Sequence, residues 1–299
     1  MLQELHDDKG NEILIAGVFD GHGGTAASTT VRLTLPGFLT TALASFDDKA
    51  QDAEMELALS MAWNYTCDTY RLGCEEEEGE CIAEYDPVHG IIRAGTGSKD
   101  MVSGTTCVTA VMSISKEGAN ALTILNCGDS RALLLGRART SDGQNSKKST
   151  LESSILYNTR DHFPGDPLEF ERLMRANEAG LGFSIPQCSY SRWWLSVGDY
   201  RYALSRSLEG TFANSKGIIS DADIETVSLT QALTDREDVC LLLASDGLFE
   251  VMDNEEIGLN LLKLRSEGVG AGDAAKTIVG QALKKGTSDN VSCVVIYFS

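Results

Sequence analysis

The sequence predicts an α+β fold in which antiparallel β-sheets and helices form layers. The first observation is the order of the segments, because those with strand character follow one another in groups instead of alternating one for one with helices. The second is the composition, since 42% hydrophobic and 23% charged residues are typical of a globular protein. The third is the length: 299 residues without an internal repeat or a linker predict one domain, residues 1–299, whose core needs no disulfide.

The N-terminal third of the chain is expected to contain one strand and two helices. Apolar residues at 13–20 predict a strand that runs into a glycine-rich turn. A helical stretch begins at about Thr25, is interrupted at Pro36 and resumes towards Ala44. Residues 52–70 place apolar side chains on one helical face and predict a second helix. The acidic residues and glycines of 73–103 predict a loop or an insertion.

Strands dominate the rest of the chain. Apolar and β-branched runs bounded by glycines and polar residues indicate them. They are predicted at residues 105–114, 121–127, 131–135, 155–158, 202–208, 225–229, 239–244 and 291–298.

Three helices are expected among these strands. Asp166 is a favourable N-cap, with Pro167 in the first turn and Glu169 three residues after the cap, and Gly180 is suited to end the helix. Two more helices are predicted at residues 254–265 and 273–285.

The charge balance is strongly acidic. With 25 basic and 44 acidic residues the formal net charge is −19. This argues against nucleic acids and anionic membranes as partners, because both are bound through Lys and Arg. No apolar run reaches the roughly 20 residues of a membrane span, and the N-terminus lacks signal-peptide character. We therefore expect an intracellular protein, cytoplasmic or nuclear, that is a monomer.

The eight cysteines exclude some kinds of chemistry. No Cys-x-x-Cys pair occurs, so zinc ribbons and thioredoxin-like redox sites lack their spacing. Phosphatases that use a thiolate need an Arg six positions after the cysteine, and none of the eight cysteines has one there. A cysteine nucleophile of that kind is therefore excluded.

Aspartates lie at the ends of several predicted buried strands. The first strand runs straight into Asp20, Asp129 and Asp246 each follow a later strand, and Asp289 lies just before the last one. In an antiparallel sheet the start of one strand lies beside the end of its neighbour, so Asp289 can share an edge with Asp20 and Asp246. Several carboxylates at one edge need a cation, and an all-oxygen ligand set favours Mg²⁺ or Mn²⁺ over Zn²⁺.

The alternative is that each Asp-Gly pair is only a turn after a strand. For Asp129 alone the two interpretations are equally supported. Asp20, Asp246 and Asp289 together favour a metal site. Gly21 would let the backbone bend and bring its carbonyl close to an ion.

A histidine lies in the bend Gly21-His22-Gly23-Gly24, directly after Asp20. At a metal edge, His22 could act as a general acid towards a leaving oxygen. The competing interpretation is a structural or solvated histidine, which is the commoner role of a lone histidine. A structural role is expected for His162.

Taken in chain order, seven segments resemble the metal-dependent protein serine/threonine phosphatases of type 2C. The resemblance extends from about residue 13 to the C-terminus. The segments are Val18-Phe19-Asp20-Gly21-His22-Gly23-Gly24, Ser103-Gly104-Thr105-Thr106, Asn126-Cys127-Gly128-Asp129-Ser130-Arg131, Thr159-x-Asp161-His162, Leu204-Ser205-Arg206, Ala244-Ser245-Asp246-Gly247-Leu248-Phe249 and Ser288-Asp289-Asn290-Val291-Ser292.

This resemblance implies two packed antiparallel β-sheets flanked by α-helices, an αββα sandwich, and a pair of Mg²⁺ or Mn²⁺ ions. Asp20 would bridge both ions in the catalytic centre, the Gly21 carbonyl would bind one ion, and Asp246 and Asp289 would bind the other. Asp129 would hold a weaker third ion, and His22 would be the catalytic proton donor. Water activated between two ions would attack phosphorus in line, and the implied partner is a phosphoprotein substrate.

The sequence departs from the family pattern in three places. The family has an N-terminal strand with an Arg that grips the substrate phosphate and a Glu-Asp pair that supports the metal. Only 19 residues precede Asp20 here and none is Arg, so this strand is expected to be missing. Glu209-Gly210 stands where the family has Gly-Asp, and Glu250 where it usually has Asp.

Three functions follow from these observations. The first is an active phosphoprotein phosphatase, which the complete set of metal-binding positions favours. The second is a catalytically inactive member of the family that acts as a binding or regulatory module, which the missing Arg and the altered Glu209-Gly210 segment favour. The third is a metal-dependent hydrolase of small phosphate esters, which sequence does not separate from the first.

Overall fold

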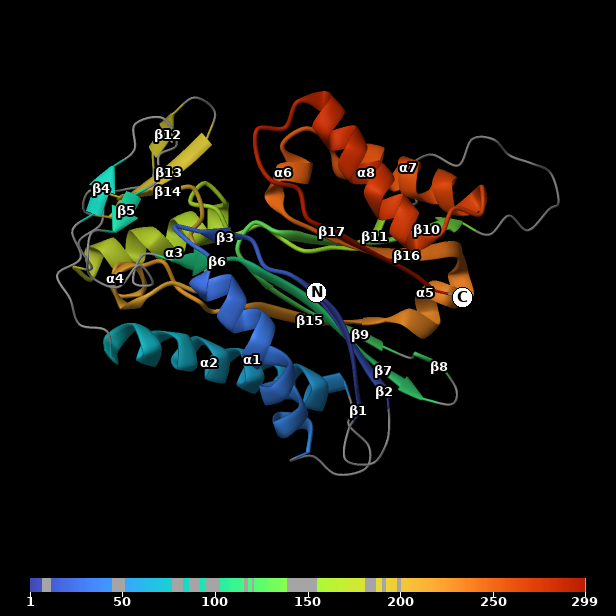
Figure 1. Ribbon diagram of the computed structural model, residues 1–299, viewed down its shortest axis with the longest axis horizontal. Coiled ribbons are helices and arrows are strands. Elements are labelled where there is room, and N and C mark those ends of the chain that lie inside the picture. The colour runs from blue at the N-terminus through green and yellow to red at the C-terminus, as the bar shows by residue number, and fades with distance from the viewer. Residues whose placement is uncertain are drawn as a thin grey trace.

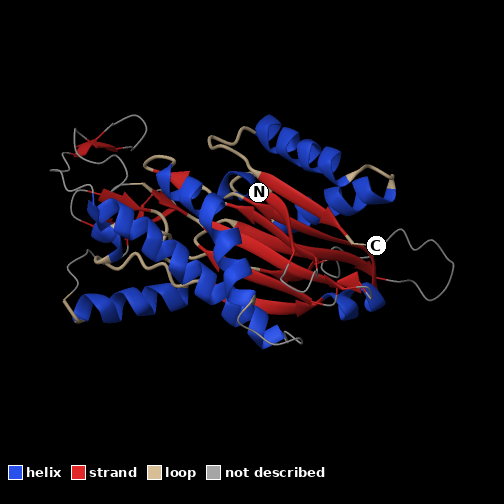
Figure 2. Cartoon of the chain, turned by 60° about the horizontal axis from the view of Figure 1, so that its bottom comes forward, coloured by secondary structure: helices blue, strands red, loops and turns tan. Residues whose placement is uncertain are grey.

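Two antiparallel sheets lie face to face at the centre of the molecule, and helices cover their outer faces (Figure 1). Coloured by secondary structure, the chain shows the strands stacked between the helical layers (Figure 2). The computed structural model describes residues 1–6, 12–44, 52–76, 83–85, 92–94, 103–115, 118–119, 121–138, 155–180, 187–189, 192–197 and 200–298. The architecture confirms the predicted α+β sandwich.

The first sheet has the strand order β1-β2-β7-β9-β15, and β8 pairs with β7. Every neighbouring pair in it is antiparallel. Its strands are β1 (Leu2–His6), β2 (Glu12–Val18), β7 (Cys107–Ser115), β8 (Gly118–Ala119), β9 (Ala121–Cys127) and β15 (Asp223–Ser228).

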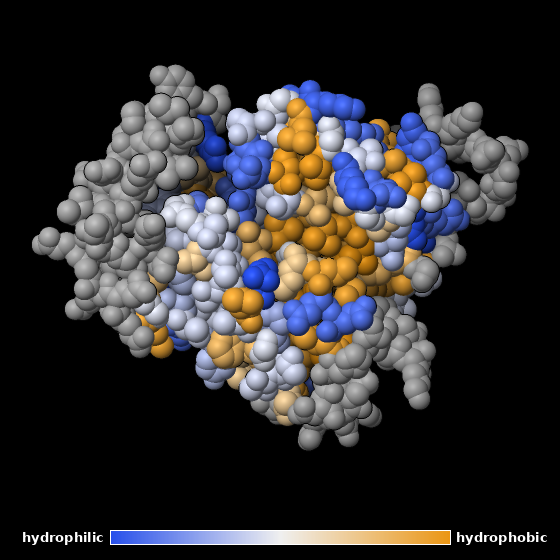
Figure 3. All heavy atoms as spheres, in the orientation of Figure 1, coloured by the Kyte–Doolittle hydropathy of each residue, from blue (hydrophilic) through white to orange (hydrophobic). Residues whose placement is uncertain are grey.

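The second sheet has the order β11-β10-β16-β17 and is also antiparallel throughout. Its strands are β10 (Arg131–Ala138), β11 (Ile155–Asn158), β16 (Arg236–Ala244) and β17 (Cys293–Tyr297). Because β17 is an edge strand, its side chains are only partly buried. A space-filling view in the orientation of Figure 1 shows apolar side chains gathered near the middle of the visible side of the molecule, between the two helical layers (Figure 3).

Two pairs of helices form the outer layers. α1 (Ala26–Leu43) and α2 (Asp52–Glu76) share a buried core with the first sheet, whereas α7 (Asn254–Ser266) and α8 (Ala271–Lys285) share one with the second. The two pairs lie on opposite sides of the sandwich (Figure 1). Among the described residues, no helix is long and apolar enough to cross a membrane.

The side chains of the central strands alternate between two cores, as the two-residue period of a strand requires. On β2, Ile15 packs with α1 and α2, while its neighbour Ala16 lies in the core between the sheets. On β10, Leu134 joins that same inter-sheet core and Leu133 packs with α7 and α8. Both faces of these strands are therefore buried, which fixes where their ends lie.

Smaller elements lie at one end of the sandwich and around its edges. The strands are β3 (Gly21–His22), β4 (Ala83–Tyr85), β5 (Ile92–Ala94), β6 (Gly104–Thr105), β12 (Gln187–Ser189), β13 (Arg192–Val197) and β14 (Tyr200–Tyr202), and the helices are α3 (Pro167–Glu178), α4 (Thr211–Asn214), α5 (Leu229–Asp235) and α6 (Asp246–Phe249). Asp166 caps α3 as predicted, because its side chain accepts hydrogen bonds from the amides of Leu168 and Glu169.

The structure corrects two expectations about the elements. α1 continues through Pro36, which is buried inside the helix, so packing outweighs the hydrogen bond that proline removes. The strand predicted at 202–208 is largely wrong, since β14 ends at Tyr202. The amides of Ser205, Ser207 and Leu208 donate to the carbonyls of three separated segments, and no continuous ladder forms.

Two further differences concern the N-terminal third. The Arg-bearing N-terminal strand of the family was expected to be missing, yet the structure has a strand there, β1, which pairs with β2 and contains no Arg. α2 continues to Glu76, into the predicted loop at 73–103, and the short pair β4 and β5 lies in the same segment. The rest of that predicted loop, apart from Ser103, lies outside the described residues.

Candidate metal centre

Three predicted metal ligands meet at one rim of the sandwich. Asp20 follows the end of β2 in the first sheet, whereas Asp246 begins α6 directly after β16 in the second. Asp289 lies just before β17, and the antiparallel pairing of β16 with β17 brings the end of one strand beside the start of the other. The shared edge is thus the rim between two sheets, not the edge of a single sheet that the sequence suggested.

The carboxyl groups at this rim are close together. Those of Asp20 and Asp246 are hydrogen-bonded to each other. One carboxylate oxygen from each of Asp246, Glu250 and Asp289 lies within 4.8 Å of the other two. The structure therefore brings the three predicted aspartates together and adds Glu250, one helical turn after Asp246. A donor set made only of carboxylate oxygens fits a hard divalent cation such as Mg²⁺ or Mn²⁺.

The protonation behaviour of the rim shows that its negative charge is not balanced by the protein. Burial, together with the charges of Asp246 and Asp289, raises the pKa of Asp20 to about 7. Burial and the charge of Asp289 likewise raise the pKa of Asp246. Burial, followed by the charges of Asp246 and Asp161, raises the pKa of Asp129 to about 7. Bound cations would supply the missing positive charge.

The backbone of Asp20 is fixed by two threonines, one at the end of β6 and one between β6 and β7. The Thr106 amide donates to the Asp20 carbonyl at 2.9 Å, and the Asp20 amide donates to the Thr106 hydroxyl at 3.2 Å. The Thr105 hydroxyl also donates to the Asp20 carbonyl at 3.0 Å. The short pairing of β3 with β6 continues this contact and sets Gly21 opposite Thr105. The turn that carries Asp20 and Gly21 is therefore held on both sides.

Gly247 allows the two acidic loops of the second sheet to approach each other. A Cβ atom at this position would lie 2.4 Å from the Asn290 carbonyl oxygen and 3.2 Å from the Asp289 Cβ. A side chain would therefore push the segment of Asp289 away from the start of α6. The Thr287 hydroxyl, which donates to the Gly247 carbonyl at 2.8 Å, closes the same contact from the other side.

His22 is paired with a buried carboxylate. Its Nε2 lies 2.5 Å from Oε1 of Glu209, which also accepts a hydrogen bond from the Ser207 hydroxyl at 2.5 Å. The Glu209 side chain is 2% exposed and that of His22 is 35% exposed. Burial lowers the pKa of His22, but the charge and hydrogen bond of Glu209 outweigh this and raise it above its usual value. Glu209 therefore favours the protonated form of His22 beside the rim.

Asp129 lies in the bend after β9, and its position depends on His162. The Gly128 amide donates to Nδ1 of His162 at 3.1 Å, and the His162 amide donates to the Gly128 carbonyl at 2.9 Å. Nε2 of His162 lies 3.1 Å from an oxygen of Asp223. The imidazole is fully buried. These contacts agree with the structural role expected for His162, which holds the loop of Asp129.

A second group of charges lies next to this loop, and we call it the ion-pair cluster; it consists of Arg160, His162, Glu169, Arg172, Arg206 and Asp223. Arg206 contacts Glu169 at 2.6 Å and Asp223 at 3.0 Å. Arg172 contacts Glu169 at 2.9 Å. Burial raises the pKa of Glu169, but hydrogen bonds from Arg206 and Arg172 outweigh it and lower the pKa to about 2. In this cluster the protein itself balances the buried negative charge.

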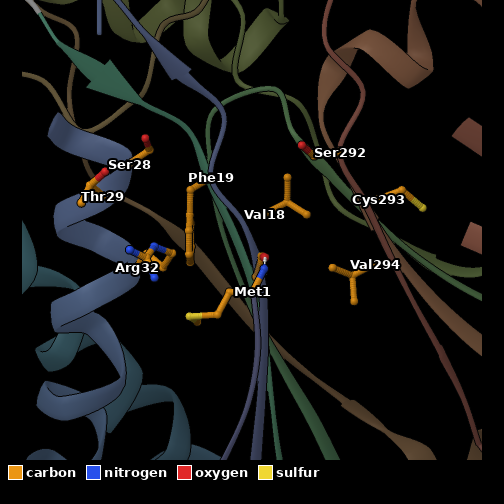
Figure 4. A pocket seen from close by; sticks show the side chains of 10 residues that line it. Met1, Val18, Phe19, Ser28, Thr29, Arg32, Ser292, Cys293 and Val294 are labelled. Atoms are coloured by element: carbon orange, nitrogen blue, oxygen red, sulfur yellow. Dashed lines mark hydrogen bonds between the residues drawn. The ribbon is translucent and has the colours of Figure 1, made fainter. Parts of the chain in front are cut away.

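A cavity of about 360 Å³ lies beside the rim, between β2, α1 and β17 (Figure 4). Phe19, Arg32 and Ser292 are among the residues that line it. The Met1 amino group lies at its wall and donates to the Gly17 carbonyl at 2.5 Å. Among the described residues that line it, none is acidic, so this cavity is not the candidate metal centre.

Three residues of the site were missed by sequence reasoning. Glu209 was noted as a departure from the family pattern, and an acidic residue directly after the apolar Leu208 was the only sign of its burial. Thr106 belongs to the segment Ser103-Gly104-Thr105-Thr106, which resembles the family, but no role was assigned to it from the sequence. Arg192, whose guanidinium lies 3.6 Å from Asp246, gave no signal, because nothing in the sequence joins it to that strand end.

Comparison with known proteins identifies the family. A family model described as "Protein phosphatase 2C" matches residues 2–291. "Probable protein phosphatase 2C 61" from Arabidopsis thaliana is 28% identical over 273 residues, covering 91% of this chain and 70% of that protein. "Protein phosphatase 1L" from Bos taurus is 29% identical over 285 residues, covering 95% of this chain and 64% of that protein. The chain thus spans about two thirds of these relatives.

Solved structures share the fold. A serine-threonine phosphatase 2C from Toxoplasma gondii superposes with a TM-score of 0.67 at 20% identity, covering 96% of this chain and 85% of that one. A Caenorhabditis elegans structure titled as a sex determining protein superposes with a TM-score of 0.69 at 18% identity, covering 99% of this chain and 60% of that one. At such identities the likeness concerns the fold alone.

Proposed function

The chain belongs to the protein phosphatase 2C family of serine/threonine protein phosphatases, and on that premise we propose that it hydrolyses phosphoserine and phosphothreonine in proteins at a binuclear Mg²⁺ or Mn²⁺ centre. One observation carries this proposal: Asp20, Asp246 and Asp289 converge at one rim, where the pKa values of Asp20 and Asp246 are raised. A protein keeps such unbalanced carboxylates together at a cost in stability unless cations bind there.

Several residues of the rim would together bind the metal ions. The carboxylates of Asp20, Asp246 and Asp289, together with the Gly21 carbonyl, would hold the two ions. Asp129, one loop away, would hold a weaker third ion. Ions held by these residues would supply Lewis-acid chemistry, because they would polarise the phosphoryl oxygens and lower the pKa of water in the site.

His22 is suited to the second half of the reaction. Glu209 accepts a hydrogen bond from its Nε2 and favours the protonated ring. A protonated imidazole beside the rim can give its proton to the leaving oxygen of the serine or threonine, which otherwise departs as an alkoxide. Because Glu209 is buried and also bonded to Ser207, it holds the ring in one orientation.

The direct test is the turnover of a phosphoserine peptide with Mn²⁺, with and without a chelator. We expect activity that the chelator abolishes and added Mn²⁺ restores. Asp246→Asn keeps the shape of the side chain but removes a ligand charge, and we expect it to lower turnover by about a thousandfold or more. Asp68→Asn, at an exposed position on α2, is the matched control and should keep full activity.

Each other result points to a different function. A folded protein that binds Mn²⁺ but never turns over substrate would favour the inactive binding module. Turnover of p-nitrophenyl phosphate without turnover of any phosphopeptide would favour a hydrolase of small phosphate esters. Full activity of Asp246→Asn would refute the assignment of the metal centre.

A further inference from the structure

The strand β13 is firmly attached to the body of the protein through one of its faces. Leu195 is fully buried in a small core with Leu173. The Trp193 ring lies against the backbone of Gly165, where a Cβ atom would come within 2.2 Å of it, and meets the Phe170 ring edge-on at 6.0 Å. Because strand side chains alternate, this anchored face leaves Arg192 and Trp194 on the opposite face.

That opposite face carries positive charge on an aromatic ring. The guanidinium of Arg192 lies 5.5 Å from the centre of the Trp194 ring, and that of Arg201, from β14, lies at the same distance. In the pairing of β13 with β14, Arg201 is opposite Ser196, the next residue on the face of Trp194. Such contacts restrict where a long side chain can point. The ring therefore helps to direct Arg192.

The side chain of Arg192 extends to the rim. Its guanidinium lies 3.6 Å from Oδ2 of Asp246 and 3.8 Å from Oε1 of Glu250. Both distances are too long for good hydrogen bonds, and the Arg192 side chain is 48% exposed. Arg192 is thus a loosely held cation beside carboxylates that would bind metal ions. Once those carboxylates bind ions, the attraction on the guanidinium weakens and its donors become available.

We propose that Arg192 binds the phosphate group of the substrate at this rim. The planar guanidinium can donate two parallel hydrogen bonds to phosphoryl oxygens, which a dianionic phosphate monoester offers. The strand β13 and the Trp194 ring hold the side chain where such a group would lie, close to Asp246. This inference rests on the proposed function, because it assigns a substrate contact to the same site.

The first test measures phosphate binding directly. Inorganic phosphate is titrated calorimetrically into the Mg²⁺-loaded protein, and the KM for a phosphoserine peptide is measured with Mn²⁺. We expect Arg192→Ala to raise both the Kd for phosphate and the KM by about tenfold or more, as loss of a charge-assisted contact does. Arg192→Lys should recover part of this loss, since it keeps the charge but not the paired donors. Arg175→Ala, a 75% exposed arginine on α3, is the control and should change neither value.

The second test separates a substrate contact from structural support of the metal site. Calorimetric titration of Mn²⁺ into the chelator-treated protein should show that Arg192→Ala binds the metal at least as tightly as the wild type, because a competing cation has been removed. Weaker Mn²⁺ binding in Arg192→Ala would show that Arg192 supports the site and would overturn the proposal. An unchanged Kd for phosphate would also overturn it, as would a wild-type protein that binds no phosphate.

The two proposals fail in different ways. A wild type without metal-dependent turnover would refute the proposed function, yet the phosphate titration would still decide the role of Arg192. Turnover that is metal-dependent and equally efficient in Arg192→Ala would leave the proposed function standing and refute this inference.

Discussion

Two groups of carboxylates lie close together in this protein and behave in opposite ways. At the rim, burial and mutual repulsion raise the pKa of Asp20 to about 7. In the ion-pair cluster, burial also acts on Glu169, but hydrogen bonds from Arg206 and Arg172 lower its pKa to about 2. The Glu169 side chain is only 1% exposed, whereas Asp20 is only partly buried. The more deeply buried of these two carboxylates is therefore the one whose negative charge the protein neutralises.

This difference teaches that burial of acidic groups does not by itself mark a metal site. What distinguishes the rim is that its acidic side chains outnumber the basic side chains near them, which include His22 and the loosely held Arg192. In the ion-pair cluster each carboxylate has at least two positively charged or hydrogen-bonding partners. A structural role therefore follows for the cluster and an ion-binding role for the rim.

The largest effect is expected from removing the central charge of the ion-pair cluster. Glu169→Gln keeps the shape of the side chain but leaves Arg172 and Arg206 without their shared carboxylate. We expect the free energy of unfolding to fall by about 3–5 kcal/mol, the usual cost of breaking a buried ion pair on one side. Urea unfolding measures it. A loss below about 1 kcal/mol would show that the cluster is not the structural counterpart of the rim.

The next effect is a difference in pH dependence between the two groups. The rim carboxyls gain their raised pKa on folding, so in chelator-treated protein their stabilising contribution is present below the unfolded pKa near 3.8 and is lost as pH rises through about 7. The sign is reversed for Glu169, whose contribution is present above about 4.5 and is lost as pH falls towards 2.

Thermal unfolding across this pH range, with and without Mn²⁺, separates the two contributions. We expect the loss towards pH 7 to disappear when Mn²⁺ holds the rim carboxylates ionised, and the acid loss to be the same with and without metal. Mn²⁺ that leaves the profile unchanged at neutral pH would contradict the comparison.

A smaller effect of the opposite sign to Glu169→Gln is expected at the rim. Asp246→Asn removes one of the repelling charges and lets an amide donate to Asp20. We expect the chelator-treated variant to gain about 1 kcal/mol at slightly alkaline pH, the order of one like-charge contact in a partly solvated site. Its stabilisation by added Mn²⁺ should shrink at the same time. Destabilisation of the metal-free variant would mean that the pair with Arg192 is structural after all.

The smallest effect serves as a baseline for both groups. Glu171 lies on α3 two residues after Glu169 and pairs with Arg175, but these side chains are 58% and 75% exposed. Glu171→Gln should therefore change the free energy of unfolding by at most about 0.5 kcal/mol. A loss as large as that of Glu169→Gln would show that the helix, not the buried charge, is responsible.

The parts of this fold that the sequence predicts are those that depend on local pattern. Apolar runs that lead into Asp20 and Asp246 predicted two buried strands and the positions where these strands end. The structure places both aspartates at the rim. The N-cap Asp166 was recognisable because a cap acts within three residues. The order of the motifs supplied the arrangement of two packed sheets, which periodicity alone did not.

What the sequence could not predict depends on contacts between distant segments. His22 and Glu209 are 187 positions apart, and no periodic signal joins them. Arg192 reaches Asp246 from β13, whose Trp193 packs against the loop of Gly165. The segment after Tyr202 resembles a strand, yet its amides bond to separate partners. Pro36 looked like an interruption, but the packing of α1 outweighed the local preference.

The hydrogen bond from the Gly128 amide to Nδ1 of His162 joins the two groups of charges. Because Nδ1 accepts this hydrogen bond, Nε2 carries the proton that is directed at Asp223. His162 thus links the loop of Asp129 to the carboxylate of Asp223 in the ion-pair cluster. The loop that carries Asp129 is therefore held in place by the balanced charges of the ion-pair cluster, even though Asp129 lies near other carboxylates that repel it.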